Sequence, residues 1–71
     1  MDDLMPWSQQ AEDAIIGGLL LENKRWDVIS HLLIAEHFYS QTNAKVFAAI
    51  STLITSGKPA DVITVNEQLK F

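Results

Sequence analysis

The chain contains no cysteine, few basic residues and no long apolar run, and each absence excludes a class of protein. Without cysteine there is no disulfide scaffold and no thiolate zinc site, so stability must come from packing. The longest apolar run, residues 14–21, is about half as long as a membrane span. The N-terminus is acidic where a secretory signal would be basic. The sequence therefore predicts a soluble, cytoplasmic protein without a membrane segment.

Positive charge is also scarce, and this limits the partners that the chain can bind. Five Lys and Arg residues stand against nine Asp and Glu residues, which gives a net charge of −4. Non-specific nucleic-acid binding depends on Lys and Arg that neutralise phosphates, so we expect no direct nucleic-acid binding. No phosphate-binding loop of the form G-x-x-x-x-G-K-[ST] occurs. We expect no catalytic residue, no cofactor and no metal.

The strongest helical pattern lies at residues 42–56, which we place at the centre of the fold. Ser40 or Thr42 can cap its first amides, and Gly57 is a typical stop signal. Spacings of three and four residues predict one broad buried face. The apolar side chains of that face are Val46, Phe47, Ala49, Ile50, Leu53 and Ile54.

A first helix is predicted to follow Ser8, a typical N-cap residue. Its apolar side chains are so numerous after residue 13 that we expect this helix to be buried nearly all round. Gly17 and Gly18 each weaken a helix by about 1 kcal/mol relative to Ala, which favours close crossing by another helix. The alternative is that the pair only marks where the helix weakens.

A short second helix is predicted after Asn23, which can act as its N-cap. Residues 34–39 fit either a helical turn or a short extended connector. Phe38 and Tyr39 are expected to fill the space between the first two helices and the central one. The inner face of the second helix is predicted to hold Trp26, Ile29, Leu32 and Leu33.

The last segment is predicted to run as an extended connector to Ile63 and then as a helix from about Val65. Thr64 and Glu67 have the spacing of a capping box, in which each side chain satisfies a backbone amide of the other residue. A helix of barely two turns is unstable alone, so its apolar side must dock on the core.

These elements predict an all-α fold, a small orthogonal bundle of about four to five short helices. We expect one domain over residues 8–71, preceded by a flexible lead-in at residues 1–7. The predicted core consists of Ile15, Leu19, Trp26, Ile29, Phe38, Val46, Phe47, Ile50, Leu53 and Leu69. The candidate partner contacts are Trp7, Met5 and Phe71.

The polar residues that invite a chemical interpretation have unsuitable spacings. His31 and His37 fall on different sides of a helix, and Glu36 completes no zinc site, so we assign them structural or surface roles. Glu12 and Asp13 diverge by about 100° on a helix, which argues against a paired catalytic site. Acids near a helix N-terminus are common because the helix dipole favours them.

The order and spacing of several motifs resemble the N-terminal domain of bacterial replicative DNA helicases of the DnaB type. The resemblance runs from about Pro6 to Leu69. The family usually has a histidine where this chain has Asn43, and its domain continues into a helical hairpin after the region that resembles this chain. The motifs are QAE at 10–12, IIGGLL at 15–20, Trp26, FY at 38–39, VFAAI at 46–50, Leu53 and GKPADVITV at 57–65.

The resemblance implies a non-catalytic protein–protein interaction and assembly module of a hexameric helicase. In the family, the hairpin pairs subunits and contacts primase, while ATP hydrolysis resides in a separate motor domain. The implied partners are helicase subunits, primase and a loader. As a head without its pairing hairpin, the chain is expected to be a monomer or a weak homodimer.

Two other functions remain open from the sequence. The chain could be a stand-alone phage or plasmid regulator that mimics this head. It could also be a small helix-turn-helix nucleic-acid binder, although its acidic charge disfavours that function.

Overall fold

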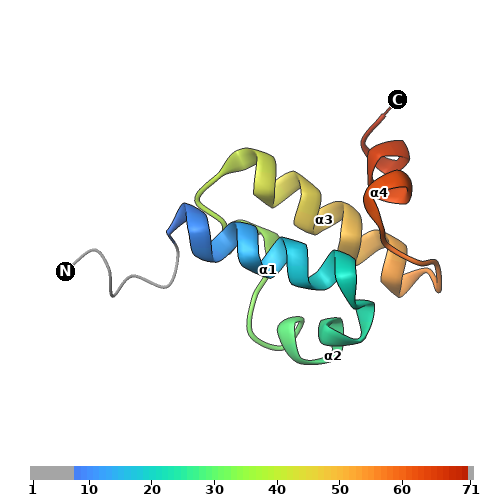
Figure 1. Ribbon diagram of the computed structural model, residues 1–71, viewed down its shortest axis with the longest axis horizontal. Coiled ribbons are helices and arrows are strands. Elements are labelled where there is room, and N and C mark those ends of the chain that lie inside the picture. The colour runs from blue at the N-terminus through green and yellow to red at the C-terminus, as the bar shows by residue number, and fades with distance from the viewer. Residues whose placement is uncertain (1–7, 71) are drawn as a thin grey trace.

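The computed structural model describes residues 8–70, which form four α-helices and two 3₁₀ turns with no strand among them. The all-α prediction is confirmed (Figure 1). The predicted lead-in lies outside the described residues. Within the described range, no helix is long and apolar enough to cross a membrane. In chain order the elements are α1 (Gln9–Leu21), η2 (Asn23–Arg25), α2 (Trp26–Ile29), η3 (Ala35–His37), α3 (Gln41–Thr55) and α4 (Val62–Leu69).

Helix α3 is the centre of the arrangement, because it contacts α1, η3 and α4. Helices α1 and α3 lie side by side and run in the same direction (Figure 1). Helix α2 and the two 3₁₀ turns form the connection that returns the chain from the end of α1 to the start of α3. Helix α4 lies across α3, which fits the predicted orthogonal packing (Figure 1).

Both ends of α3 are set by local sequence. The Ser40 hydroxyl accepts a hydrogen bond from the Asn43 amide (3.2 Å), so Ser40 is the N-cap. After the last turn, Gly57 adopts a φ of 78°, a conformation that costs glycine little. The Lys58 amide then donates to the Leu53 carbonyl (2.9 Å), as in a Schellman motif. The predicted central helix is confirmed.

The core surrounds the ring of Phe47, which is 2% exposed. Its ring centroid lies 4.8 Å from that of Phe38 and 5.3 Å from that of Trp26. Of the predicted core residues, the structure buries Leu19, Phe38, Phe47, Ile50 and Leu53. The others are partly buried and pack against that cluster: Ile15, Trp26, Ile29, Val46 and Leu69.

The prediction that α1 is buried nearly all round is wrong. Leu21 is 90% exposed, and the buried residues of α1 form one stripe of Glu12, Ile16 and Leu19. Helix α1 packs against α3 along this stripe, and Ala14 on another side is exposed. Helix α1 therefore contains more apolar residues than it buries in the core.

No helix in the described part of the chain crosses closely at the glycine pair, so that prediction is also wrong. A Cβ placed on Gly17 would meet no described atom within 4 Å. On Gly18 it would meet only the side chain of Arg25, at 3.6 Å, which is ordinary van der Waals contact. The glycines therefore do not provide the helix contact that their spacing suggested.

The connection between α2 and α3 differs from its prediction at two apolar positions. Leu32 is 64% exposed instead of facing inward, while its neighbour Leu33 is 7% exposed. Tyr39 is 89% exposed, so of this pair only Phe38 packs beside the central helix. Both proposed conformations occur in this segment, because η3 is followed by extended backbone at Phe38.

Helix α4 begins at Val62, so the start predicted near Val65 is wrong. The Asp61 carboxylate accepts a hydrogen bond from the Thr64 amide (2.8 Å). In return, the Thr64 hydroxyl accepts one from the Asp61 amide (2.8 Å). This capping box starts the helix three residues before the box predicted from Thr64 and Glu67.

Candidate protein-interaction surface

A buried carboxylate joins the N-terminal ends of α1 and α3. Glu12 is 1% exposed, and its carboxylate oxygens accept hydrogen bonds from the backbone amides of Tyr39 (2.6 Å) and Ser40 (3.2 Å). The side-chain amide of Asn43 also donates to it (3.3 Å). These donors precede or open α3, where a helix dipole favours negative charge. Glu12 therefore fixes the start of α3 against α1.

The surroundings of Glu12 keep it ionised. Burial raises the pKa of this carboxyl group, but hydrogen bonds from Tyr39, Asn43 and Ser40 favour the charged form. Neighbouring Asp13 raises the pKa as well, and the net effect is a pKa below the ordinary value of 4.5. The hydrogen bonds that the Glu12 carboxylate accepts come from Tyr39, Ser40 and Asn43, which precede or open α3. Glu12 therefore has a structural role as an ionised side chain.

Sequence reasoning missed this role, although a signal was present. Glu12 lies on the same helical stripe as Ile16 and Leu19, four and seven residues further on. A carboxylate in a buried stripe requires several hydrogen-bond donors. Asn43, the position where the resembling family usually has histidine, provides one of them and also donates to Asp13 (3.1 Å).

A second polar connection lies at the opposite end of α1. The Asn23 side-chain amide donates to the carbonyls of Leu19 (2.7 Å) and Ala60 (2.9 Å). Its carbonyl oxygen accepts from the Ala60 backbone amide (2.9 Å). The predicted N-cap role of Asn23 is wrong, because the residue before η2 is Glu22, and it makes no side-chain cap bond. Asn23 instead joins α1 to the segment that precedes α4.

The histidines form no site in the described part of the chain. His31 and Glu36 are exposed, and His37 accepts a hydrogen bond from the Ile34 amide through Nδ1 (3.2 Å). Among residues 8–70, no group of three His, Cys, Asp or Glu side chains could hold a metal ion. The candidate functional site is therefore a binding surface and not a chemical centre.

A groove lies between α3 and α4. Its hollow has a volume of about 530 Å³. Leu69 of α4 and Val46 of α3 are half-buried in its walls. Ala48 is exposed on α3, between the groove residues Lys45 and Thr52. We call this surface the α3–α4 groove; it is lined by Thr42, Lys45, Val46, Ala48, Ala49, Thr52, Gln68 and Leu69.

A second hollow adjoins this groove on the other side of α3. It has a volume of about 400 Å³ and is bounded by Trp26, Leu33 and Ile34. Ala48 and Thr52 line both hollows. The outward face of α3 is therefore a low ridge of small side chains with an apolar depression on each side.

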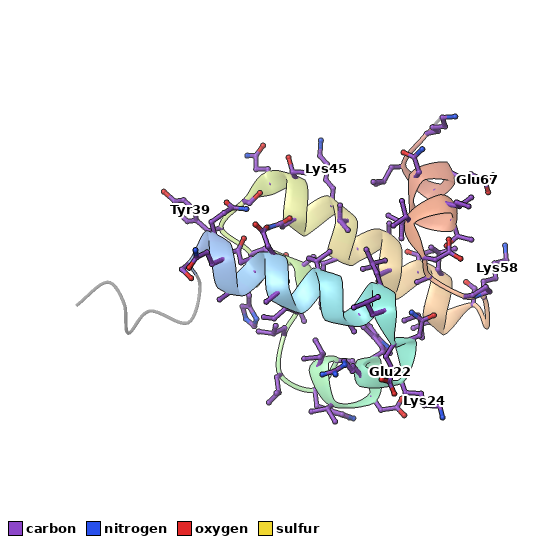
Figure 2. All side chains as sticks on the ribbon, viewed as in Figure 1. Glu22, Lys24, Tyr39, Lys45, Lys58 and Glu67 are labelled. Carbon is purple, nitrogen blue, oxygen red and sulfur yellow. The ribbon has the colours of Figure 1, made fainter. Side chains whose placement is uncertain are left out.

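Other large apolar side chains are exposed elsewhere on the molecule. Figure 2 shows Tyr39 projecting outward near the start of α1. The predicted partner contacts Met5, Trp7 and Phe71 lie outside the described residues and stay predictions. The exposed set is Leu21, Val28, Leu32, Ile34, Tyr39, Val62 and Ile63.

Comparison with known proteins shows which family the chain belongs to. A family model described as the DnaB-like helicase N terminal domain matches residues 4–71. Replicative DNA helicase DnaB of Buchnera aphidicola subsp. Schizaphis graminum is 37% identical over 65 residues, which cover 92% of this chain and 14% of the relative. The protein of the same name from Pasteurella multocida is 38% identical, with the same coverage.

A more distant relative gives the same result. Replicative DNA helicase DnaC of Bacillus subtilis is 32% identical over 68 residues, which cover 96% of this chain and 15% of the relative. The chain thus spans about a seventh of the length of these relatives, and the matching family model is that of the N-terminal domain alone. The resemblance noted in the sequence is confirmed. The chain belongs to the family of DnaB-like helicase N-terminal domains.

Proposed function

We propose that this chain is a non-catalytic protein–protein interaction and assembly module in DNA replication. Its partners would be subunits of a hexameric replicative helicase, primase or a helicase loader. The observation that best supports this function is the α3–α4 groove, an apolar depression on the exposed side of the central helix. Family membership supports the replication context, because the relatives are named replicative DNA helicases.

By itself the chain is proposed to be a monomer or a homodimer no tighter than tens of micromolar. Specific stable interfaces bury at least about 1,200 Å² in total. The described chain has an accessible surface of 5197 Å², and its exposed apolar side chains come from several separate elements. Because these side chains are spread over α1, α2, the α2–α3 connection and α4, we expect the described residues to form no face large enough for tight pairing.

The test is association with the replicative helicase and the primase of the same organism, measured by sedimentation velocity. We expect the chain to co-sediment with at least one of them. Ala48→Arg, which projects a long side chain from the ridge of α3, should weaken that association about tenfold or more.

Ala14→Arg is the matched control, because Ala14 is an exposed alanine within α1 and does not line the groove. It should leave the association unchanged. Failure of the wild-type chain to associate with either protein would contradict the proposed function.

A further inference from the structure

The α3–α4 groove has the shape of a seat for one more helix. Its floor is formed by α3 between Thr42 and Thr52, which extends over about 15 Å at 1.5 Å per residue. One wall is formed by α4 through Gln68 and Leu69. Ala48, Ala49 and Thr52 along the floor are small, which allows another helix to approach to the usual interaxial distance of about 8–10 Å.

The apolar lining indicates what such a helix would cover. Val46 and Leu69 are only partly buried by the fold, and both line the groove. A helix that presents apolar side chains at spacings of three and four residues would bury the exposed remainder of both. An extended peptide would instead leave backbone amides without partners, because α3 and α4 offer no strand edge.

The charge of the lining selects among such helices. Lys45 is its single charged residue, in a chain whose net charge is −4. Within residues 8–70, no acidic side chain forms an ion pair with Lys45. Figure 2 shows its side chain projecting outward from α3. A partner helix that lies in the groove passes beside this ammonium group, so a carboxylate on that helix would gain an ion pair with Lys45.

We propose that the α3–α4 groove binds an amphipathic α-helix of a partner protein, with an acidic side chain of that helix placed at Lys45. The inference rests on the proposed interaction function and adds the chemistry of the partner. A second copy of this chain is the less suitable occupant, because each copy has a net charge of −4 and two copies repel, whereas a partner helix needs only one carboxylate at Lys45 and can be neutral overall.

The test uses two capped 15-residue peptides with the same leucine stripe and otherwise neutral residues. One has Glu and the other Lys at the two positions that flank the stripe. Each is titrated into ¹⁵N-labelled protein and followed by NMR. The Glu peptide should bind with a Kd on the order of 100 µM and shift the amides of Ala48, Ala49 and Leu69. The Lys peptide should bind about fivefold more weakly.

Charge reversal provides the decisive comparison. Lys45→Glu should weaken binding of the Glu peptide about five- to tenfold and strengthen binding of the Lys peptide. Lys58→Glu alters the net charge equally but lies outside the groove, so it should shift the two affinities in the same directions as Lys45→Glu but by less than about twofold. Ala48→Arg should abolish binding of both peptides, while Ala14→Arg should not.

Several results would overturn the inference. These are equal affinities for the two peptides, shifts centred outside the groove, or no binding at millimolar peptide. Concentration-dependent groove shifts without peptide, together with a dimer in sedimentation, would identify a second copy as the occupant. If helicase or primase associates and Ala48→Arg has no effect on it, the proposed function stands and the groove inference fails.

Discussion

Replacement of the buried carboxylate tests most directly how the fold is held. In Glu12→Gln, one side-chain oxygen remains as an acceptor, and the other becomes an amide that faces the backbone N–H groups of Tyr39 and Ser40. At least one of those N–H groups then lacks a buried acceptor, which costs about 1–3 kcal/mol, and the remaining bonds lose their charge assistance. We expect a loss of about 2–4 kcal/mol in the free energy of unfolding.

That loss is large for a chain of this size. Total stability should be only about 4–10 kcal/mol, at about 0.05–0.15 kcal/mol per residue. Each kcal/mol shifts the melting temperature of such a domain by about 4–8 °C, so Glu12→Gln should melt about 8–32 °C below the wild type. Asp13→Asn is the control, since Asp13 is exposed and its carboxylate accepts only from Gln9 and Asn43 among residues 8–70. It should shift the midpoint little.

The pH dependence of the free energy of unfolding tests whether the ionised form of Glu12 is the stabilising one. The pKa of Glu12 is lowered in the folded state, so the stabilisation is complete above the ordinary value of 4.5 and is lost as pH falls through the folded pKa. The Gln side chain of Glu12→Gln does not titrate, so the variant lacks this pH-dependent contribution. Urea unfolding followed by circular dichroism should show the difference between wild type and variant shrinking below pH 4.5. A difference that is constant or grows on acidification would refute the role of the ionised carboxylate.

Three further predictions test other parts of the structure. Phe47→Ala should cost about 3–5 kcal/mol in chemical unfolding, because the ring is 2% exposed between two aromatic neighbours, whereas Thr52→Ala should cost under about 0.5 kcal/mol. Asp61→Ala should cost about 1 kcal/mol through the lost cap of α4, and Glu67→Ala almost nothing; the reverse order would restore the later helix start. Fluorescence anisotropy at about 100 mM salt should detect no DNA binding tighter than about 10⁻⁴–10⁻⁶ M, and a steep salt dependence with tighter binding would contradict the interaction-module assignment.

Those parts of the fold that local sequence decides could be predicted. For α3, the apolar spacing, the Ser40 cap and the Gly57 stop all agree, and the helix lies where they place it. For α4, two capping boxes overlap, and both include Thr64. Its single hydroxyl accepts from the Asp61 amide, so the earlier box prevails, but spacing alone could not rank the two.

The functional surface was harder to predict, because it depends on which apolar residues the fold leaves uncovered. Val46 and Leu69 have the periodicity of core residues, and both do pack against the core. Their remaining exposure depends on how α4 packs against α3, a tertiary contact that the local sequence of either helix does not specify. Glu12 was missed for a similar reason, since its donors are 27 to 31 residues further along the chain.

The placement of the polar contacts explains how one central helix can serve both the fold and a partner. Glu12 holds the first part of α1 against the start of α3. Asn23 holds the end of α1 against the segment that follows α3. These contacts and the face around Phe47 fix α3 in place, while Ala48 lies exposed on the ridge between the two hollows. Ala48 can therefore vary without loss of the core, and binding through the groove can change independently of stability.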